Sequence, residues 1–589
     1  MRYSWKIGGP AGYGIKSAGL IFAKTFLKKG YFVFYYSEYP SLIRGGHNTV
    51  QIDISDKPIG SASEKIDFLL ALDDETIKTD KQYLKKDGAL LYDDTCQDEK
   101  ILPKENIYSV PFTELAKKTG NEIMRNSVAL GATLALFDSE IEELKEAASH
   151  VFKKEEGGEA NRKAIQIGYD YVKEHSEAIT KNRLNKLKKK DEEKILLTGN
   201  EAIAMGALVG GCKFFSAYPM TPATAILHYL AKHQRETDMI VHQGEDEIGV
   251  IHQALGASFA GARSMVATSG GGFALMNEGL SLAGMTETPL VIVEVTRPAP
   301  ATGLPTWSDQ GDLSFVLSAG HGDFPKVVLA PGDPEEAYLL TQRAFNFSEK
   351  YQLPVIILSD KFLGESKYSV IKNQINNLKI MIERGNIVKS ESAAENYKRY
   401  LNTKNGVSPR AFPGTKNGEH IANSDEHDEF GFSVEGYGAS RIEQMDKRKR
   451  KMEGVLSEML PPVFYGPKNA DLTIISWGSN KGPILDALIS IDYKIPGKNL
   501  TVNYLHFSYI YPLPESVEPL IKKCRQLLLV ECNQSGQFAK LLRQETGIYV
   551  KDKLLKYDGR PFWPQEIIDK IQFLHIKKSK KFLWKIWKN

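Results

Sequence analysis

The sequence predicts an α/β protein with three domains, each built on a parallel sheet covered by helices. The chain has 589 residues, whereas one hydrophobic core usually supports a domain of roughly 100–200 residues. Strand-like and helix-like segments alternate in three separate stretches, and such alternation is typical of parallel sheets. A long polar stretch interrupts this alternation, so we expect α/β units joined by a segment of a different kind.

The first unit is predicted to span residues 1–180. Its strand YSWKIGG leads into the glycine-rich turn GGPAGYG, an amphipathic helix over 15–29 and the apolar strand YFVFYY. The stretch KNRLNKLKKKDEEK (181–194) is dense in charge and poor in apolar side chains, which favours a solvated linker. We therefore expect a domain boundary there.

The second unit is predicted over 194–370, with the strands KFFSAY, MIVHQ, SMVATS, LVIVEV, KVVLA and LPVIILS. The polar residues 371–462 follow. They favour either an ordered segment that wraps around the protein or a partly helical connection, since EQMDKRKRKMEGVL has helical composition. A third α/β unit, 463–589, contains ADLTIISWGS, VNYLHFSYIYPLP and QLLLVECNQSG.

Composition excludes several classes of protein. The net charge is only +3, so no overall field favours nucleic acid. No apolar run approaches the roughly 18–20 residues that span a bilayer, and no signal peptide is recognisable. A cytoplasmic location is expected. The four cysteines, Cys96, Cys212, Cys524 and Cys532, form no CxxC pair, so free thiols are favoured over a disulfide, a zinc site or an iron–sulfur cluster.

Three candidate site segments each follow a predicted strand of the second unit. They are SAYPMTP (216–222), SGGG (269–272) and Arg297. Because the carboxyl ends of parallel strands share one edge of a sheet, we expect these segments to meet.

Each segment has a chemical use. Prolines around Thr221 would fix its hydroxyl so that it can hold a substrate oxygen. The glycines allow close approach of a flat ring or an anion, and the planar fork of Arg297 suits a carboxylate. Taken singly, the segments also fit a stiff turn, a packing loop and a surface arginine.

An acidic run supplies a fourth candidate. HQGEDEIGVIHQALGASFAGAR places Glu245, Asp246 and Glu247 at the start of a predicted helix, where the helix dipole by itself would stabilise acids. The helix then carries small residues at 249, 254, 256–258, 260 and 261, which permit close packing. An acid at its start would be buried and would need a partner, and a ring nitrogen is one solution.

These motifs together resemble a known family. YPMTP, GEDEIGVIHQALGASFAGAR, ATSGGGFALMNEGLSLAGM and EVTRPAPATGLPTWSDQGDL are similar to the α subunit of the 2-oxoacid:ferredoxin oxidoreductases, which are thiamine diphosphate enzymes. The first unit resembles the family's γ domain through GGPAGYGIKSAG and SEYPSLIRGGHNTVQIDIS, and SPRAFPG and DEHDEFG match the connecting segment. The resemblance implies a γ-type domain, a pyrimidine-binding domain, a connecting segment and a transketolase C-terminal-like domain, in a fused γ–α order.

The resemblance also implies roles for residues. Glu247 matches the glutamate that activates the cofactor by bonding the N1′ nitrogen of its aminopyrimidine. Thr221 and Arg297 match positions that hold the substrate. The implied cofactor-binding residues are Tyr218, Pro219, Glu247, Ser269, Gly270 and Gly271. The family often has proline where this chain has Gly271.

Some family parts are missing from the sequence. Gly311, Gly322 and Gly332 continue as GDL, GDF and GDP, so the GDG motif of a diphosphate and magnesium half-site does not occur. The resemblance implies a partner β subunit that carries magnesium and an iron–sulfur cluster, with CoA as acyl acceptor and ferredoxin as electron acceptor. A heterodimer or a dimer of heterodimers is expected, with 2-oxoglutarate as the favoured 2-oxoacid.

Three alternatives remain open on the residues alone. GGPAGYG with Glu38 imitates a dinucleotide-binding fingerprint, although its glycines read GxxGxG. A non-catalytic assembly protein built on a degenerate cofactor domain is the second. The third is a metal site at His420, Asp425, Glu426, His427 and Asp428, against which we favour a solvated loop, so no metal is assigned to this chain.

Overall fold

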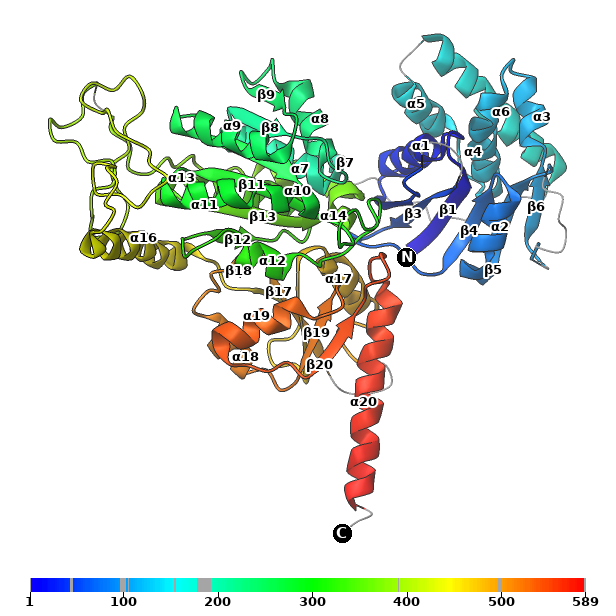
Figure 1. The fold of residues 1–589 in the computed structure, drawn as a ribbon. Helices are drawn as coiled ribbons and strands as arrows, with labels where there is room; N and C mark the ends of the chain where they lie inside the picture. Colours follow the sequence, from blue (N-terminus) through cyan, green and yellow to red (C-terminus); the bar gives the residue numbers. More distant parts are fainter. Residues whose placement is uncertain are drawn as a thin grey trace. The chain divides into compact units, whose positions relative to one another are not determined.

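A computed structural model describes residues 2–42, 46–95, 102–103, 105–152, 155–176, 192–389, 391–495 and 501–586. The chain forms two compact units (Figure 1). Unit 1 comprises Met1–Leu197, Glu365–Gln374 and Trp563–Glu566, and unit 2 comprises Thr198–Gly364, Ile375–Phe562 and Ile567–Asn589. The predicted linker residues 181–191 and Cys96 lie outside the described residues. The domain boundaries drawn from the sequence stay a prediction.

Unit 1 contains an eight-stranded sheet in the order β6-β5-β4-β1-β3-β2-β14-β7. Its strands are β1 (Arg2–Pro10), β2 (Phe32–Glu38), β3 (His47–Ser55), β4 (Ile66–Ala71), β5 (Leu84–Asp93), β6 (Ile107–Val110), β7 (Lys194–Thr198) and β14 (Lys367–Ile371). Strands β1, β4, β5 and β6 are parallel, whereas β3 is antiparallel to both β1 and β2. The alternation pattern did not predict β3, because no helix separates it from β2 in the sequence.

The helices of unit 1 pack on this sheet. They are α1 (Ile15–Lys28), α2 (Asp74–Asp80), α3 (Phe112–Lys117), α4 (Arg125–Leu136), α5 (Glu142–Val151) and α6 (Glu155–His175), with short 3₁₀ turns η1 (Lys81–Tyr83) and η3 (Glu122–Met124). The predicted helix over 15–29 is confirmed as α1. Its apolar side chains recur at helical spacing and face the sheet, where Phe22 stacks on Trp5 with ring centroids 4.0 Å apart.

Unit 2 contains a seven-stranded sheet in the order β18-β12-β13-β11-β10-β8-β9. Its strands are β8 (Phe214–Ala217), β9 (Ile240–Gln243), β10 (Ser264–Thr268), β11 (Leu290–Thr296), β12 (Val327–Leu329), β13 (Pro354–Asp360) and β18 (Tyr509–Tyr511). The six strands predicted for the second domain are confirmed, and they are parallel. The seventh, β18, comes from the third predicted domain and pairs antiparallel with β12.

The helices around this sheet include the elements that carry the candidate site. They are α7 (Gly199–Val209), α8 (Thr224–His233), α9 (Glu247–Phe259), α10 (Gly270–Leu275), α11 (Asn277–Met285), α12 (Leu313–Ser318), α13 (Pro334–Tyr351) and α14 (Lys361–Glu365). Helix α7 begins with a capping box between Thr198 and Glu201, and Asp333 caps α13 just before Pro334, as expected for helix starts.

A third sheet also lies in unit 2, in the order β15-β17-β16-β19-β20. Its elements are β15 (Val463–Tyr465), β16 (Leu472–Trp477), η5 (Gly478–Asn480), α17 (Lys481–Ser490), β17 (Val502–Phe507), α18 (Val517–Lys522), β19 (Leu527–Glu531), α19 (Gln537–Thr546), β20 (Asp552–Leu555) and α20 (Pro564–Ile586). One buried cluster joins side chains of both sheets, including Ile292 and Trp477. The predicted α/β class with three sheets is therefore confirmed.

The polar segment 371–462 combines both predicted alternatives. It holds the short helix α15 (Lys372–Asn376) and the long helix α16 (Gly438–Glu458), whose helical composition was recognised in the sequence. The loops between them are ordered by isolated β-bridges, such as the one between Ile387 and Arg410. No helix of the described residues is long and apolar enough to cross a membrane.

Candidate functional site

The three strand-end segments of the second sheet meet as the parallel order requires. Strands β11, β10 and β8 are neighbours, so the residues that follow them share one edge of the sheet. Arg297, just after β11, donates from Nη1 to the carbonyl oxygen of Thr221 at 2.6 Å. Thr268, at the end of β10, lies 3.9 Å from the sulfur of Met220 through its Oγ1.

The turn after β8 is held by its backbone. Asn200 donates to the carbonyl oxygen of Pro222 at 2.9 Å, and Arg297 holds the carbonyl of Thr221. The sequence assigned substrate binding to the Thr221 hydroxyl, whereas the structure uses the carbonyl of this residue as an anchor. Tyr218, at the start of the turn, is 41 % exposed.

Arg297 is half-buried and retains binding capacity. Burial lowers the pKa of its guanidinium, but an arginine stays cationic at neutral pH. In the described part of the chain no carboxylate forms an ion pair with it. Its guanidinium group can therefore bind the carboxylate of a ligand.

The three acids of the acidic run have different surroundings. Asp246 is the N-cap of α9 and accepts from the backbone N–H of Gly249 at 2.7 Å, and Glu245 is exposed. Glu247 is only 3 % exposed, and its Oε1 has no hydrogen-bond partner within the described chain. Burial, together with the charge of Asp246, raises the pKa of Glu247.

The glycine segment after β10 forms the first turn of α10. An added Cβ at Gly272 would lie 2.4 Å from Oε1 of Glu247 and 2.1 Å from Oγ1 of Thr268, whereas Gly271 has open space around it. Gly272 is thus a packing glycine and Gly271 faces open space. Ser269, which precedes the turn, has a buried Oγ that makes no hydrogen bond with the described residues.

These features fit the pyrimidine side of a thiamine site. A buried carboxyl without a donor needs a ligand group or a proton, and an aminopyrimidine nitrogen can share that proton. Gly271, the residue before the glycine that packs on Glu247, has open space around it, and Arg297 supplies a cation at the same sheet edge.

A second group of buried acids, which was not predicted from the sequence, lies beside this turn. Glu294 is fully buried in β11, and Asp312 precedes α12 with its Oδ2 against Gly270. Asp309 lies near Asp312, and its pKa is raised to about 7 by burial and neighbouring acids. The available signal was a single acid inside the apolar strand LVIVEVT, since acids are rarely buried without a reason.

Comparison with known proteins decides the family. Residues 205–447 match the family model described as pyruvate flavodoxin/ferredoxin oxidoreductase, thiamine diP-bdg, and residues 4–171 match pyruvate ferredoxin/flavodoxin oxidoreductase. The chain is 34 % identical to a 2-oxoacid:ferredoxin oxidoreductase subunit alpha of Sulfolobus sp, covering 96 % of each chain. The chain belongs to this family.

Two further relatives concern 2-oxoglutarate. The family member from Magnetococcus marinus described as 2-oxoglutarate:ferredoxin oxidoreductase with 2-oxoglutarate, coenzyme A and succinyl-CoA bound has a TM-score of 0.89 and 33 % identity, and the match covers 97 % of this chain and 99 % of that one. A 2-oxoglutarate synthase subunit KorA from Methanothermobacter marburgensis is 32 % identical over 64 % of this chain and 98 % of its own.

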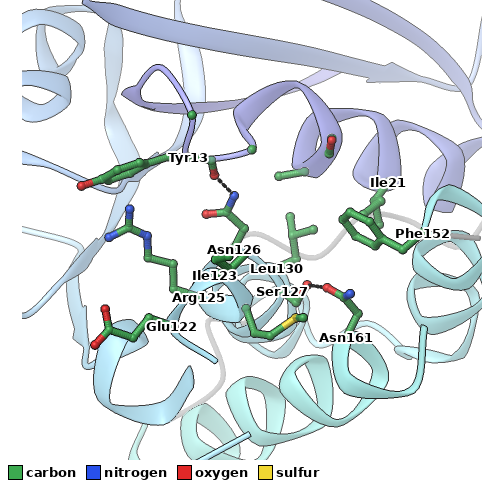
Figure 2. Close-up of a pocket in the computed structure, with 15 residues that line it drawn as sticks. Tyr13, Ile21, Glu122, Ile123, Arg125, Asn126, Ser127, Leu130, Phe152 and Asn161 are labelled. Carbon is green, nitrogen blue, oxygen red and sulfur yellow. Dashed lines mark hydrogen bonds between the residues drawn. The ribbon is translucent and has the colours of Figure 1, made fainter. Parts of the chain in front are cut away.

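Unit 1 of the present chain contains a separate pocket of about 650 Å³. Figure 2 shows Tyr13 and Arg125 on one side of it, and the guanidinium carbon lies 3.4 Å from the Tyr13 ring centroid. Asn126 donates to the carbonyl of Tyr13. The apolar part of the lining includes Ile21, Ile123, Met124, Leu130 and Phe152.

The dinucleotide alternative does not fit the topology of unit 1. In that fold the strand after the first helix is the parallel neighbour of the first strand. Here β3 lies between β1 and β2. Glu38, which would bind a ribose, instead lies at the end of β2, where the hydroxyl of Tyr36 donates to it at 3.2 Å.

The segment 420–428, which contains the predicted metal-site residues, is held by hydrogen bonds and ion pairs to the rest of unit 2. His427 is fully buried, and its ring nitrogens contact the carbonyls of Asp428 and Met285. Glu426 pairs with Arg448 at 2.8 Å. Within the described ranges no group of three His, Cys, Asp or Glu side chains could hold a metal ion. The interpretation as a solvated loop was wrong for His427, which has a structural role.

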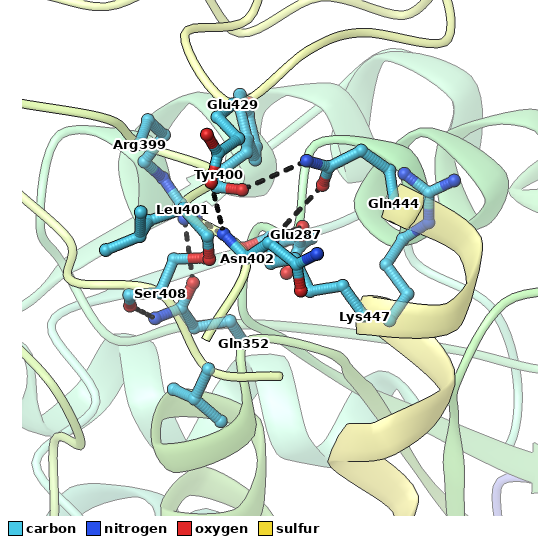
Figure 3. A network of polar contacts seen from close by, with 12 residues as sticks. Glu287, Gln352, Arg399, Tyr400, Leu401, Asn402, Ser408, Glu429, Gln444 and Lys447 are labelled. Carbon is cyan, nitrogen blue, oxygen red and sulfur yellow. Dashed lines mark hydrogen bonds and ion pairs between the residues drawn. The ribbon is translucent and has the colours of Figure 1, made fainter. Parts of the chain in front are cut away.

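The connecting segment 371–462 is anchored by a network of buried charges (Figure 3). Glu287 forms ion pairs with Lys447 and Lys451 of α16, and the backbone carbonyl of Glu287 accepts from Arg399 at 2.8 Å. The nearby cations lower the pKa of Glu287 despite its burial. The network fixes the connecting segment to the loop before β11.

Proposed function

We propose that this chain is the α subunit of a thiamine diphosphate-dependent 2-oxoacid:ferredoxin oxidoreductase with 2-oxoglutarate as favoured substrate. The reaction is the CoA-dependent oxidative decarboxylation of the 2-oxoacid to an acyl-CoA and carbon dioxide. Electrons pass to ferredoxin through a partner β subunit, which also supplies magnesium and an iron–sulfur cluster. A cytoplasmic location belongs to the same proposal.

One observation carries the proposal: Glu247 is buried, and its Oε1 has no hydrogen-bond partner among the described residues. When bound, thiamine diphosphate supplies the carbon nucleophile that attacks the keto carbon. Glu247 would hold the pyrimidine of the cofactor and share a proton with its nitrogen, and the raised pKa of this carboxyl group suits that exchange. Arg297 binds the substrate carboxylate, and the turn around Thr221 fixes its position.

A partner chain is supported by the exposed surface around the site. Helix α9 exposes Ile248 by 47 % and Phe259 by 37 %, with the small residues Gly249 and Gly256 between them. The neighbouring edge strand β9 exposes Ile240 by 64 %. Apolar side chains around small residues are suited to close packing by another subunit. We infer that the β subunit covers this face.

For CoA, we propose the pocket of unit 1 shown in Figure 2. The Tyr13 ring and the apolar lining suit an adenine ring, and Arg125 provides a cation for its phosphates. The Magnetococcus marinus protein, whose description includes bound CoA, supports CoA as the co-substrate. Replacement of Arg125 with alanine is expected to raise KM for CoA and leave KM for 2-oxoglutarate unchanged.

The test is reconstitution with the β partner and measurement of 2-oxoglutarate-dependent reduction of a viologen dye in the presence of CoA. Glu247→Gln is expected to lower kcat on the order of 100–10,000-fold, because general acid–base groups contribute about that much. Glu245→Gln is the matched control in the same acidic run and is expected to retain activity. Pyruvate assayed in parallel tests the substrate preference.

Two results would contradict the proposal. Full turnover by the Glu247→Gln complex would remove Glu247 from the chemistry and favour a non-catalytic assembly protein. Full activity of the isolated chain without a β partner would refute the two-chain site.

A further inference from the structure

Two acids, Glu294 and Asp312, lie close to the glycine turn of α10. Glu294 is fully buried, at the point where β11 pairs with Thr268 of β10. Both of its side-chain oxygens lack a donor within the described chain, as does Oδ2 of Asp312. The two carboxyl groups are neighbours, since each acts on the pKa of the other.

A hydrogen bond between two carboxyl groups requires a proton. Two buried carboxylates would repel each other and lose their hydration. Burial and the neighbouring Asp312 raise the pKa of Glu294 well above its usual range, and burial also raises the pKa of Asp312, an effect that Glu294 partly offsets. Glu294 is therefore the donor and Asp312 the acceptor.

Asp312 of this pair lies against the glycine turn. A Cβ added at Gly270 would lie 2.5 Å from Oδ2 of Asp312, and one added at Gly272 would lie 2.4 Å from Oε1 of Glu247. The first turn of α10 is therefore held between two carboxyl groups. Gly271, which lies between these two contacts, has open space.

We propose that Glu294 and Asp312 form a proton-sharing carboxyl pair that positions the glycine turn of α10 against Glu247. The inference rests on the proposed function, because that turn lines the pyrimidine site. Both are positioning residues: they act through Gly270 and do not touch substrate. Loss of the shared proton places a second negative charge behind the turn and displaces it.

The surroundings of the pair contain further acids. Asp309 faces Asp312, and Asp360 and Glu531 act on Asp309 in turn. Glu247 lies across the turn. No cation of the described residues shifts the pKa of Glu294 or Asp312. Deprotonation at alkaline pH is therefore not compensated by a nearby positive charge.

Two measurements on the full chain with its β partner test the inference. The first is the pH profile of 2-oxoglutarate turnover. The second is amide hydrogen exchange of the segment 264–276, compared at neutral and alkaline pH after correction for intrinsic exchange. The wild type is expected to lose turnover and protection of the turn as pH rises. Glu294→Gln keeps a hydrogen-bond donor that cannot ionise. Its loss of turnover and of protection at alkaline pH is therefore expected to be at least tenfold smaller than that of the wild type.

A second variant and a control distinguish the role of the carboxyl pair from a general effect of pH on the protein. Glu294→Leu removes the donor and is expected to weaken protection of the turn already at neutral pH. Glu335→Gln replaces another acid of unit 2 whose pKa is raised to about 7, and it is expected to leave the alkaline loss of turnover unchanged.

The inference is overturned if Glu294→Gln loses turnover and protection over the same pH range as the wild type. The outcomes remain separate from the proposed function. A wild-type complex without 2-oxoacid turnover contradicts that function, while the hydrogen-exchange comparison still decides the carboxyl pair.

Discussion

Arg297 reaches across the end of β10 to the carbonyl oxygen of Thr221. The 2.6 Å hydrogen bond joins residues that follow β11 and β8, two strands separated by β10 in the sheet. The contact ties the ends of these two strands together and leaves part of the guanidinium available for a ligand.

Replacing Arg297 with lysine tests this contact. Lysine keeps the charge but loses the planar fork that can bond a carbonyl and a carboxylate together. We expect KM for 2-oxoglutarate to rise about 10–100-fold, the range for a lost hydrogen bond to a charged group. Arg525→Lys, at an exposed pair with Asp471, is the control and should retain the wild-type KM. An unchanged KM for Arg297→Lys would exclude carboxylate binding by this residue.

Gly272 offers a steric test of the cofactor side. An alanine Cβ would clash with Glu247 and Thr268, and overpacking of this kind typically costs about 1–3 kcal/mol. A displaced Glu247 is expected to lower kcat on the order of 100-fold. Gly271→Ala adds the same methyl group where nothing lies within 4 Å. It should keep the wild-type Tm, and equal effects on Tm and kcat from both alanines would contradict the packing argument.

The sequence predicted the parts of this fold that depend on local pattern. The six parallel strands of unit 2 read as apolar runs, and their shared edge follows from the parallel order. Long-range pairings were not predictable: β18 joins the middle sheet by pairing with β12, and nothing in the sequence YIY specifies that partner. The antiparallel strand β3 was missed because the alternation of strands and helices does not mark hairpins.

The site was predicted by residue type more than by contact. Small residues along α9 led to Glu247 as a buried acid, although Gly249 and Gly256 of that helix are exposed in this chain. The Thr221 carbonyl could not be selected, because a backbone contact has no sequence signal. Glu294 did have one, since a single acid in an apolar strand requires a partner, but its partner Asp312 lies on a different element.

The buried network of the connecting segment is expected to matter for stability. Glu287→Gln removes the carboxylate that pairs with both Lys447 and Lys451, and an uncompensated buried charge typically costs about 3–5 kcal/mol. Denaturant unfolding should show a loss of that size. Lys522→Met, at an exposed pair with Glu518, should change stability by less than about 1 kcal/mol. Equal small losses for both variants would show that the network does not anchor the segment.

Glu531 gives stability a pH dependence with a definite sign. It accepts from Nε1 of Trp477 at 3.0 Å and from the backbone N–H of Phe538 at 2.9 Å, yet burial raises its pKa to about 7. Between its ordinary pKa and about 7 the folded chain binds this proton more tightly than the unfolded chain does. The free energy of unfolding therefore falls as pH rises through that window, and this contribution is fully present only below it.

Glu531→Gln removes that contribution, because glutamine cannot ionise. We expect the decrease in Tm between pH 5 and pH 8 to be smaller in the variant than in the wild type. The remaining decrease in Tm comes from other acids whose pKa is raised, among them Asp309, with a pKa of about 7. Asp309→Asn in the same background should flatten the curve further. A wild-type Tm that increases with pH over this window, or one that responds to neither substitution, would mean that these carboxyl groups are ionised in the folded protein throughout.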